Sequence, residues 1–111
     1  MSNFNLNTYM SLNRKADGLV KKIECVDGFT ISVQASDIHY ADFNIDGLDY
    51  SHVECGFPNS EPEYIMDYAD DPSSPTDTVY GYVPIELVES LINLHNDRSN
   101  IKLLTSLSIP V

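Results

Sequence analysis

Histidine, cysteine and carboxylate side chains are the groups in this chain that could bind a metal or catalyse a reaction. The histidines are His39, His52 and His95, and no two of them have the i, i+4 spacing that places two ligands on one helical face. Cys25 and Cys55 lie in alternating segments typical of core strands, where a thiol without a neighbouring cation is inert. We therefore expect no zinc site, no catalytic residue and no cofactor, and interpret the chain as non-enzymatic.

One short motif resembles half of a calcium-binding loop. The sequence DFNIDG at 42–47 offers oxygen donors at alternate positions and a glycine for a sharp bend, as the first half of an EF-hand loop does. The complete loop needs a bidentate Glu at its twelfth position, where this chain has Val53, and Glu54 comes one place late. The motif is better interpreted as a turn rich in Asp and Asn that ends at Gly47.

Charge is the strongest compositional signal. The chain of 111 residues carries a formal net charge of −11, and no Lys or Arg occurs between Lys22 and Arg98, an interval that holds all the acidic residues except Asp17. Such a surface repels nucleic acids and anionic membranes, and attracts basic protein surfaces in a salt-sensitive way. The alternative explanation is the ordinary solubility of a small acidic domain.

The element that organises the rest is a β-hairpin over residues 21–35. A three-residue loop at 26–28, with Gly28 at positive φ, pairs residue 25 with 29, 23 with 31 and 21 with 33. This register gathers five apolar side chains on one face, namely Ile23, Cys25, Phe29, Ile31 and Val33. A two-residue Asp-Gly turn would mix charged side chains into that face, so the three-residue loop is favoured.

Other patterns predict the remaining elements. Helical spacing predicts a helix over 3–14 with Ser2 as its cap, and alternation predicts a strand over 50–57 with Val53, Cys55 and Phe57 facing the core. A capping box at 60–63 predicts a short helix over 61–69.

Farther along, the pattern of residues 78–83 predicts a strand in which Gly81 marks either a bulge or a close approach. The pattern of residues 84–95 predicts the best helix of the chain, with an apolar stripe. Residues 101–111 alternate as a terminal strand does. This strand either completes the sheet or pairs with a second copy in a homodimer, since an unpaired apolar edge is a liability in a monomer.

Together these elements predict an α+β fold in one domain, with an antiparallel sheet of about four to five strands, the helix at 84–95 packed across it and a short helix at 61–69. The domain divides into an N-terminal helix at 1–17, a β-rich core at 18–83, a helix at 84–96 and the terminal strand. No apolar run long enough to span a bilayer and no secretion signal is found, so we expect a cytoplasmic protein.

Four stretches, KKIECVDGFTISVQAS, SHVECGFP, EYIMDYA and TDTVYGYVPIELVESLINLH, resemble a family of short, largely uncharacterised accessory proteins of tailed phages and prophages. The resemblance covers about residues 21–95 and rests on the overall pattern. The chain departs from the family at 40–43, where YADF replaces a Cys/Ser-Pro-Arg segment, and from residue 96 on, where the terminal strand replaces a His-Gly-Gly ending. The missing Arg argues against an anionic-ligand site in that loop.

The resemblance implies a phage protein that acts in the host cell, and small accessory proteins of phages often inhibit host defence. In one mechanism the acidic surface mimics nucleic-acid phosphates, as a DNA mimic, and occupies the basic groove of a defence nuclease. In another the protein resembles the anti-Thoeris and anti-CBASS sponges that sequester a nucleotide second messenger. A third interpretation is a structural or assembly protein that forms oligomers.

We favour the acidic mimic, whose partner is a host defence protein with a basic surface and not nucleic acid or a membrane. Its predicted partner-binding residues are Asp42, Asp46, Asp49, Glu61, Glu63, Asp67, Asp70 and Asp71, which could form one negative stripe. The sponge would instead use Tyr80 and Tyr82 to stack a base, with Asn93 or Arg98 nearby. The shortage of cations counts against it, because phosphate recognition favours Arg and Lys.

Overall fold

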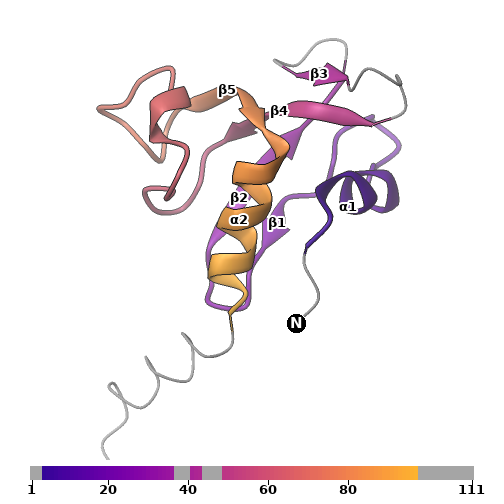
Figure 1. Ribbon diagram of the computed structural model, residues 1–111, viewed down its shortest axis with the longest axis horizontal. Helices are drawn as coiled ribbons and strands as arrows, with labels where there is room; N and C mark the ends of the chain where they lie inside the picture. The colour runs from indigo at the N-terminus through magenta and orange to yellow at the C-terminus, as the bar shows by residue number, and fades with distance from the viewer. Residues whose placement is uncertain (1–3, 37–40, 44–48, 98–111) are drawn as a thin grey trace, which may run out of the picture.

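The computed structural model describes residues 4–36, 41–43 and 49–97, which form one antiparallel sheet with helices against it (Figure 1). In chain order the elements are α1 (Leu6–Leu12), β1 (Ile23–Glu24), β2 (Thr30–Gln34), β3 (Asp42–Phe43), β4 (Tyr50–Gly56), the 3₁₀ helix η1 (Met66–Tyr68), β5 (Val79–Pro84) and α2 (Ile85–His95). The expected single-domain α+β fold is confirmed. The predicted helix cap Ser2 and the predicted terminal strand at 101–111 lie outside the described residues.

Strand β4 pairs with three other strands, and these pairings determine the order of the sheet. Cys55 pairs with Val33 of β2 and with Tyr80 of β5, so β2 and β5 lie on opposite edges of β4. His52 pairs with β3 on one side and with β5 on the other, so β3 shares an edge with β2 and continues its line. The lateral order is therefore β1, then β2 and β3, then β4, then β5.

The hairpin has the predicted register. Ile23 pairs with Ile31, the N–H of Cys25 donates to the carbonyl of Phe29 at 2.8 Å, and Gly28 has a φ of +94°. Its apolar face is buried, as are alternate residues of β2 and the second half of β4. The period-two pattern was sufficient here because a shift of one residue would have exposed every one of these side chains.

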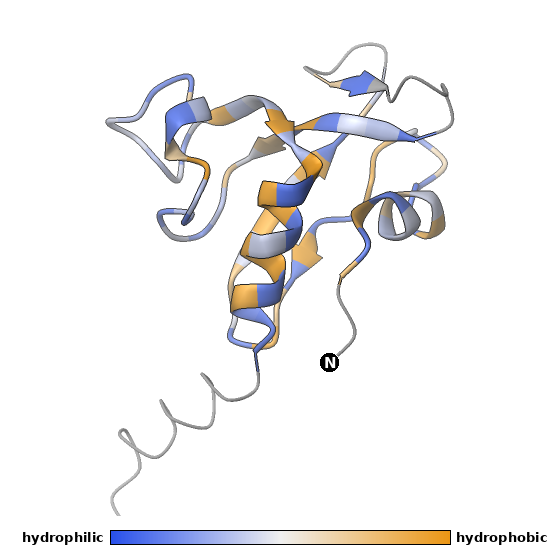
Figure 2. Cartoon of the chain, in the orientation of Figure 1, coloured by the Kyte–Doolittle hydropathy of each residue, from blue (hydrophilic) through white to orange (hydrophobic). Residues whose placement is uncertain are grey.

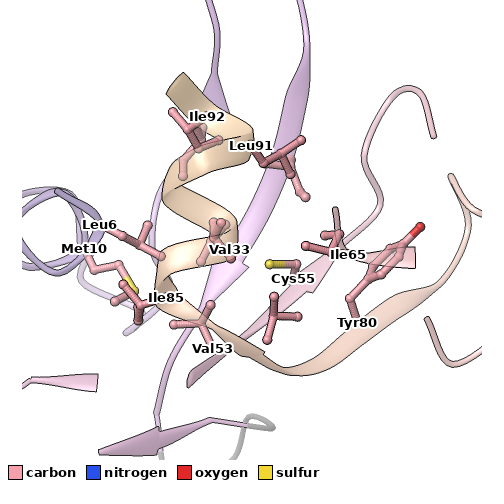
Figure 3. Close-up of a cluster of buried hydrophobic side chains, with 14 of the residues drawn as sticks. Leu6, Met10, Val33, Val53, Cys55, Ile65, Tyr80, Ile85, Leu91 and Ile92 are labelled. Atoms are coloured by element: carbon pink, nitrogen blue, oxygen red, sulfur yellow. The ribbon is translucent and has the colours of Figure 1, made fainter. Parts of the chain in front are cut away.

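Helix α2 covers the buried face of the sheet. Its buried side chains, Ile85, Val88, Leu91 and Ile92, lie at the i, i+3, i+4 spacing of one helical stripe. Figure 3 shows Leu91 and Ile92 on this helix above Val33, Val53 and Cys55 of the sheet, with Leu6 and Met10 of α1 entering from the side. Apolar residues accordingly follow α2 and the strands beneath it (Figure 2).

Amide side chains attach α1 to the rest of the fold. The helix begins later than predicted, because Asn5 caps it by accepting from the N–H of Thr8. Asn7 donates to the carbonyl of Tyr50 and accepts from its N–H, at 3.0 and 2.9 Å, as a strand neighbour would. Asn93 of α2 accepts from the N–H of Phe4. Asn5 and Asn7 of this segment therefore have structural partners.

Two local expectations for residues 57–69 are wrong. Phe57 does not face the core: β4 ends at Gly56, Phe57 takes a φ of +50° and is 51% exposed, and Pro58 is buried in its place. The helix predicted over 61–69 is reduced to η1, because Tyr64 takes a φ of +71° and interrupts the helical path. The capping-box pattern gave no indication of that left-handed residue.

The bulge expected at Gly81 is present in β5. Val53 pairs with Val83 and Cys55 with Tyr80, so three steps along β5 match two along β4. Both Tyr80 and Val83 are therefore buried, and Tyr82 is turned outward at a φ of +52°.

Candidate functional site

The structure places the predicted partner-binding acids in two groups. Asp42 lies on β3 and Asp49 immediately precedes β4, while Asp46 lies outside the described residues. The others lie in the connection between β4 and β5, where Asp77 joins them. We call this set the acidic loop, and its members, all exposed, are Glu61, Glu63, Asp67, Asp70, Asp71 and Asp77.

The two groups do not form one stripe. They lie at opposite ends of β4 (Figure 1), whose seven residues span about 20 Å at the usual rise of a strand. Exposed charges separated by more than a Debye length, about 8 Å at physiological ionic strength, are largely screened from each other. The acidic loop is therefore the larger and self-contained group.

Positive charge gathers elsewhere, in a set that we call the basic corner: Arg14, Lys15, Lys21 and Lys22. These residues lie in the connection between α1 and β1, and the guanidinium of Arg14 donates to the carbonyls of Gly18 and Ala35 at 2.7 and 3.1 Å. Because β1 and β5 are the two edges of the sheet, the connection that enters β1 and the part of the acidic loop beside β5 lie far apart. The protein is therefore electrically asymmetric.

The acidic loop is attached to the sheet near its start and again after η1. The side chain of Asn59 accepts from the N–H of Thr30 at 2.9 Å and donates to the carbonyl of Gly28 at 2.8 Å. After η1, Ala69 forms an antiparallel bridge with Tyr80, and the N–H of Asp70 donates to a carbonyl of β5 at 2.9 Å. The loop thus covers the outer edge of β5 and holds its carboxylates on a defined backbone.

A cluster centred on His95 joins the acidic loop to the hairpin. The Nδ1 of His95 lies 2.5 Å from Oδ2 of Asp27, and its Nε2 lies 2.8 Å from Oε1 of Glu63. Its ring stacks on Phe29 with centroids 4.1 Å apart and planes 10° apart. Since ionised carboxylates can only accept, this geometry favours the protonated imidazole, in which both ring nitrogens donate.

The pKa shifts in this cluster agree with its geometry. Burial favours neutral His95, but the hydrogen bonds and charges of Asp27 and Glu63 outweigh it and raise the His95 pKa above 6.5. Burial alone would raise the pKa of Asp27, but the Phe29 N–H and the His95 cation outweigh it and lower that pKa. Each group therefore stabilises the charged form of the other.

These groups are poorly arranged to act as a general base, a thiolate nucleophile or a metal site. While His95 is protonated and donates from both nitrogens, it has no lone pair with which to accept a proton or bind a metal. Burial, with the charge of Asp27, raises the pKa of the Cys25 thiol to about 11, and burial raises the pKa of Cys55 far above its ordinary value. In the described part of the chain, no group of three or more His, Cys, Asp or Glu side chains could hold a metal ion.

Among the alternative ligand residues that the structure describes, Tyr80, Tyr82 and Asn93 do not line one shared cavity. Tyr80 is fully buried and its hydroxyl donates to the carbonyl of Pro75 at 2.5 Å, so its ring cannot stack on a base. Tyr82 is 47% exposed, and Arg98 lies outside the described residues. The side-chain oxygen of Asn93 already accepts a hydrogen bond from the N–H of Phe4. The expected role of Tyr80 is therefore wrong.

Two lysine side chains lie together around a different pocket. A cavity of about 250 Å³ beside α1 and β1 is lined by Lys21 and Lys22 of the basic corner, together with Phe4, Tyr9, Asn13, Ile23, Glu24 and Asn96. The rings of Phe4 and Tyr9 lie 5.6 Å apart at 42°. Arg14 does not line this cavity, so the convergence of cations that a phosphate site requires is partial.

Sequence reasoning missed the partners of His95 and the role of the acidic loop's backbone. Sequence reasoning treats His95 only as a histidine without a second ligand on its helical face, and nothing in the sequence indicates that Asp27 and Glu63, 68 and 32 residues away, reach it. The one available signal was a histidine at the end of a helix, where a cation is favoured.

Comparison with family models, with curated proteins and with solved structures finds no match to this chain. Among the described helices, none is both long enough and apolar enough to cross a membrane.

Proposed function

We propose that this protein is a non-enzymatic phage anti-defence protein that binds a basic, nucleic-acid-binding surface of a host immune factor through its acidic loop. The observation that supports this function is the acidic loop itself, which carries six exposed carboxylates with no Lys or Arg among residues 61–77. Carboxylates presented on a defined backbone can replace the phosphate oxygens that a basic groove binds. Association of this kind is fast and weakens steeply with salt.

The acidic loop can be tested separately from the fold. Four of its acids take part in none of the side-chain hydrogen bonds described above, so their substitution would break none of them. We select these four for reversal to Lys: Glu61, Asp67, Asp70 and Asp77. Two are left in place, because Glu63 binds His95 and Asp71 accepts from the N–H and hydroxyl of Ser73. A matched control reverses four exposed acids elsewhere, namely Glu24, Asp42, Asp49 and Glu86.

The wild type and both variants are immobilised and exposed to lysate of a bacterial host at low salt, then washed with rising salt. We expect the wild type and the control variant to retain a basic nucleic-acid-binding protein that salt elutes and that a DNA duplex displaces. The acidic-loop variant should lose it, with little change in melting temperature. Equal capture by all three proteins, or a complex that resists salt, would contradict the proposed function.

The pocket beside the basic corner favours a second candidate, a sponge for a nucleotide second messenger. Lys21 and Lys22 could bind phosphates, and the tilted pair of Phe4 and Tyr9 could contact a base. Nucleotides extracted from the denatured protein distinguish the two candidates: a stoichiometric small nucleotide, lost in a Lys21→Gln/Lys22→Gln variant, supports the sponge. Its absence from protein that still captures a basic partner supports the acidic loop.

A further inference from the structure

The bulge in β5 presents a tyrosine that a regular strand would bury. In regular alternation Tyr82 would share the buried face with Tyr80, two residues before it. The extra residue shifts the pattern, so that Tyr80 is fully buried and Tyr82 is 47% exposed. Its φ of +52° is unfavourable for a bulky side chain. The fold thus maintains an exposed ring at this position despite a backbone cost.

This ring belongs to a pocket. A cavity of about 310 Å³ lies where the segment after η1 pairs with β5, and it is lined by Tyr68, Ala69, Asp70, Val79, Gly81 and Tyr82. The antiparallel bridge of Ala69 and the hydrogen bond of the Asp70 N–H hold its two sides together. Two tyrosines, small or aliphatic residues and a single carboxylate therefore surround one concave site.

The chemistry of these lining residues suits an arginine side chain better than the other candidates. A guanidinium stacks on a tyrosine face and forms paired hydrogen bonds with a carboxylate, whereas the ammonium of Lys is a compact, strongly hydrated charge that gains less from both contacts. A nucleotide would bring phosphates against Asp70 and its neighbours Asp67 and Asp71. A purely apolar side chain would leave the Asp70 carboxylate desolvated without a partner.

We propose that this pocket receives an arginine side chain of the basic partner that docks on the acidic loop. The inference rests on the proposed function and adds to it a recognition element for Arg over Lys. Asp70 provides the carboxylate and Tyr82 the stacking surface, while the other acids of the loop provide long-range attraction that does not distinguish the two cations. Binding of the partner should therefore depend on the shape of its cation as well as on its charge.

The test measures the binding of oligoarginine and oligolysine peptides of equal length to the full chain by titration calorimetry. We expect the wild type to bind oligoarginine about fivefold more tightly, which corresponds to about 1 kcal/mol for one stacked and paired guanidinium. The Tyr82→Asn variant should lose this preference and bind both peptides as the wild type binds oligolysine. Asn tolerates the left-handed conformation, so this variant should fold.

Two further variants separate the ring from the charge. Tyr82→Phe keeps the ring and should keep the preference for arginine, whereas Asp70→Asn should reduce it. Asp42→Asn removes the same charge near the other end of β4 and should leave the preference unchanged. Equal affinities for both peptides in the wild type, or a preference that survives Tyr82→Asn, would overturn the arginine site and leave the proposed function standing. If neither peptide binds, the proposed function fails as well.

Discussion

Two regions of this protein contain residues in the left-handed conformation, and these residues are glycines in one region and aromatic residues in the other. In the turns on either side of β1, the positive φ values belong to Gly18 and Gly28, at +88° and +94°. In the region from the end of β4 to the bulge in β5, they belong to Phe57, Tyr64 and Tyr82, each about half exposed. Glycine adopts this conformation without a steric cost, whereas a bulky side chain pays about 1–2 kcal/mol.

The first region avoids backbone strain, whereas the second accepts strain and holds aromatic side chains exposed to solvent. The turns around β1 use the residues that minimise strain, and the hairpin between them follows directly from the sequence. The second region holds exposed aromatic rings in an unfavourable conformation beside the acidic loop. Strain of this kind persists only where the surrounding structure imposes it, and it concentrates at functional sites. The proposed binding surface lies in that second region.

The largest expected effect comes from the cluster that joins the two regions. His95→Ala removes hydrogen bonds to Asp27 of the hairpin and Glu63 of the acidic loop, as well as the stacking on Phe29. We expect a loss of about 2–3 kcal/mol in the free energy of unfolding, measured by urea denaturation near pH 6. The control is His52→Ala. Among the hydrogen bonds described here, His52 makes one, between its Nδ1 and the neighbouring Ser51 hydroxyl at 2.8 Å. Equal losses in the two variants would show that the cluster does not join the regions.

The same cluster should make stability depend on pH in two directions. Because the folded state raises the pKa of His95, its contribution is fully present below the unfolded value of about 6.5 and is lost as pH rises through the raised value. Because the folded state lowers the pKa of Asp27, its contribution is present above about 3.8 and is lost as pH falls through the lowered value. Urea midpoints measured from pH 3 to pH 9 should decline at both ends.

His95→Phe keeps an aromatic ring on Phe29 and should flatten the alkaline decline. An NMR titration of the wild type reports the His95 pKa directly, and a value at or below 6.5 would contradict the double pairing.

A smaller change in stability is expected for the turn between β1 and β2, in the region where glycines hold the positive φ values. Gly28→Ala should lower the free energy of unfolding by about 1–2 kcal/mol, because the only penalty is the left-handed backbone. Apart from Gly28 and its two chain neighbours, no heavy atom of the described residues lies within 4 Å of the position that the new Cβ would occupy, so packing contributes nothing to this loss. Thermal and urea unfolding measure the change. A neutral substitution would show that the hairpin turn has a different conformation.

The smallest expected change in stability concerns Tyr82, in the region with exposed aromatic residues. Tyr82→Asn should leave the free energy of unfolding unchanged or raise it by about 0.5 kcal/mol, because relief of backbone strain offsets the contacts that the ring loses. Tyr82→Phe, which keeps both the strain and the ring, is the matched control. If Tyr82→Asn destabilised the protein by more than Gly28→Ala does, the ring would be a packing residue and the contrast between the two regions would disappear.

Much of the fold was predictable because its strongest signals are periodic. The register at residues 23 and 31, the buried alternation through Val53 and Cys55, the stripe on α2 and the bulge at Gly81 all appear as local patterns. The errors fall where a single residue leaves the regular conformation. Neither Phe57 nor Tyr64 has any local feature that would predict a positive φ, and each ended or prevented an element that the pattern favoured.

The candidate site was predictable only in its composition. Sequence alone identifies the interval without Lys or Arg, and hence an acidic protein, because charge needs no structure to be counted. It could not show that Asp42 and Asp49 are separated from the acidic loop by the length of β4, or that Tyr80 is buried and Tyr82 exposed.

What the sequence by itself determined was the hairpin register, the strands β4 and β5 and the helix α2, since hydrophobic periodicity and turn chemistry act over a few residues. Only the tertiary structure decided which distant residues meet: His95 with Asp27 and Glu63, and Asp70 with Tyr82 around one pocket. The contacts of Glu63 and Asp70 depend on the path of the long connection between β4 and β5. That path is set by pairing with β2 and β5 at single residues such as Asn59 and Ala69, which carry no periodic signal.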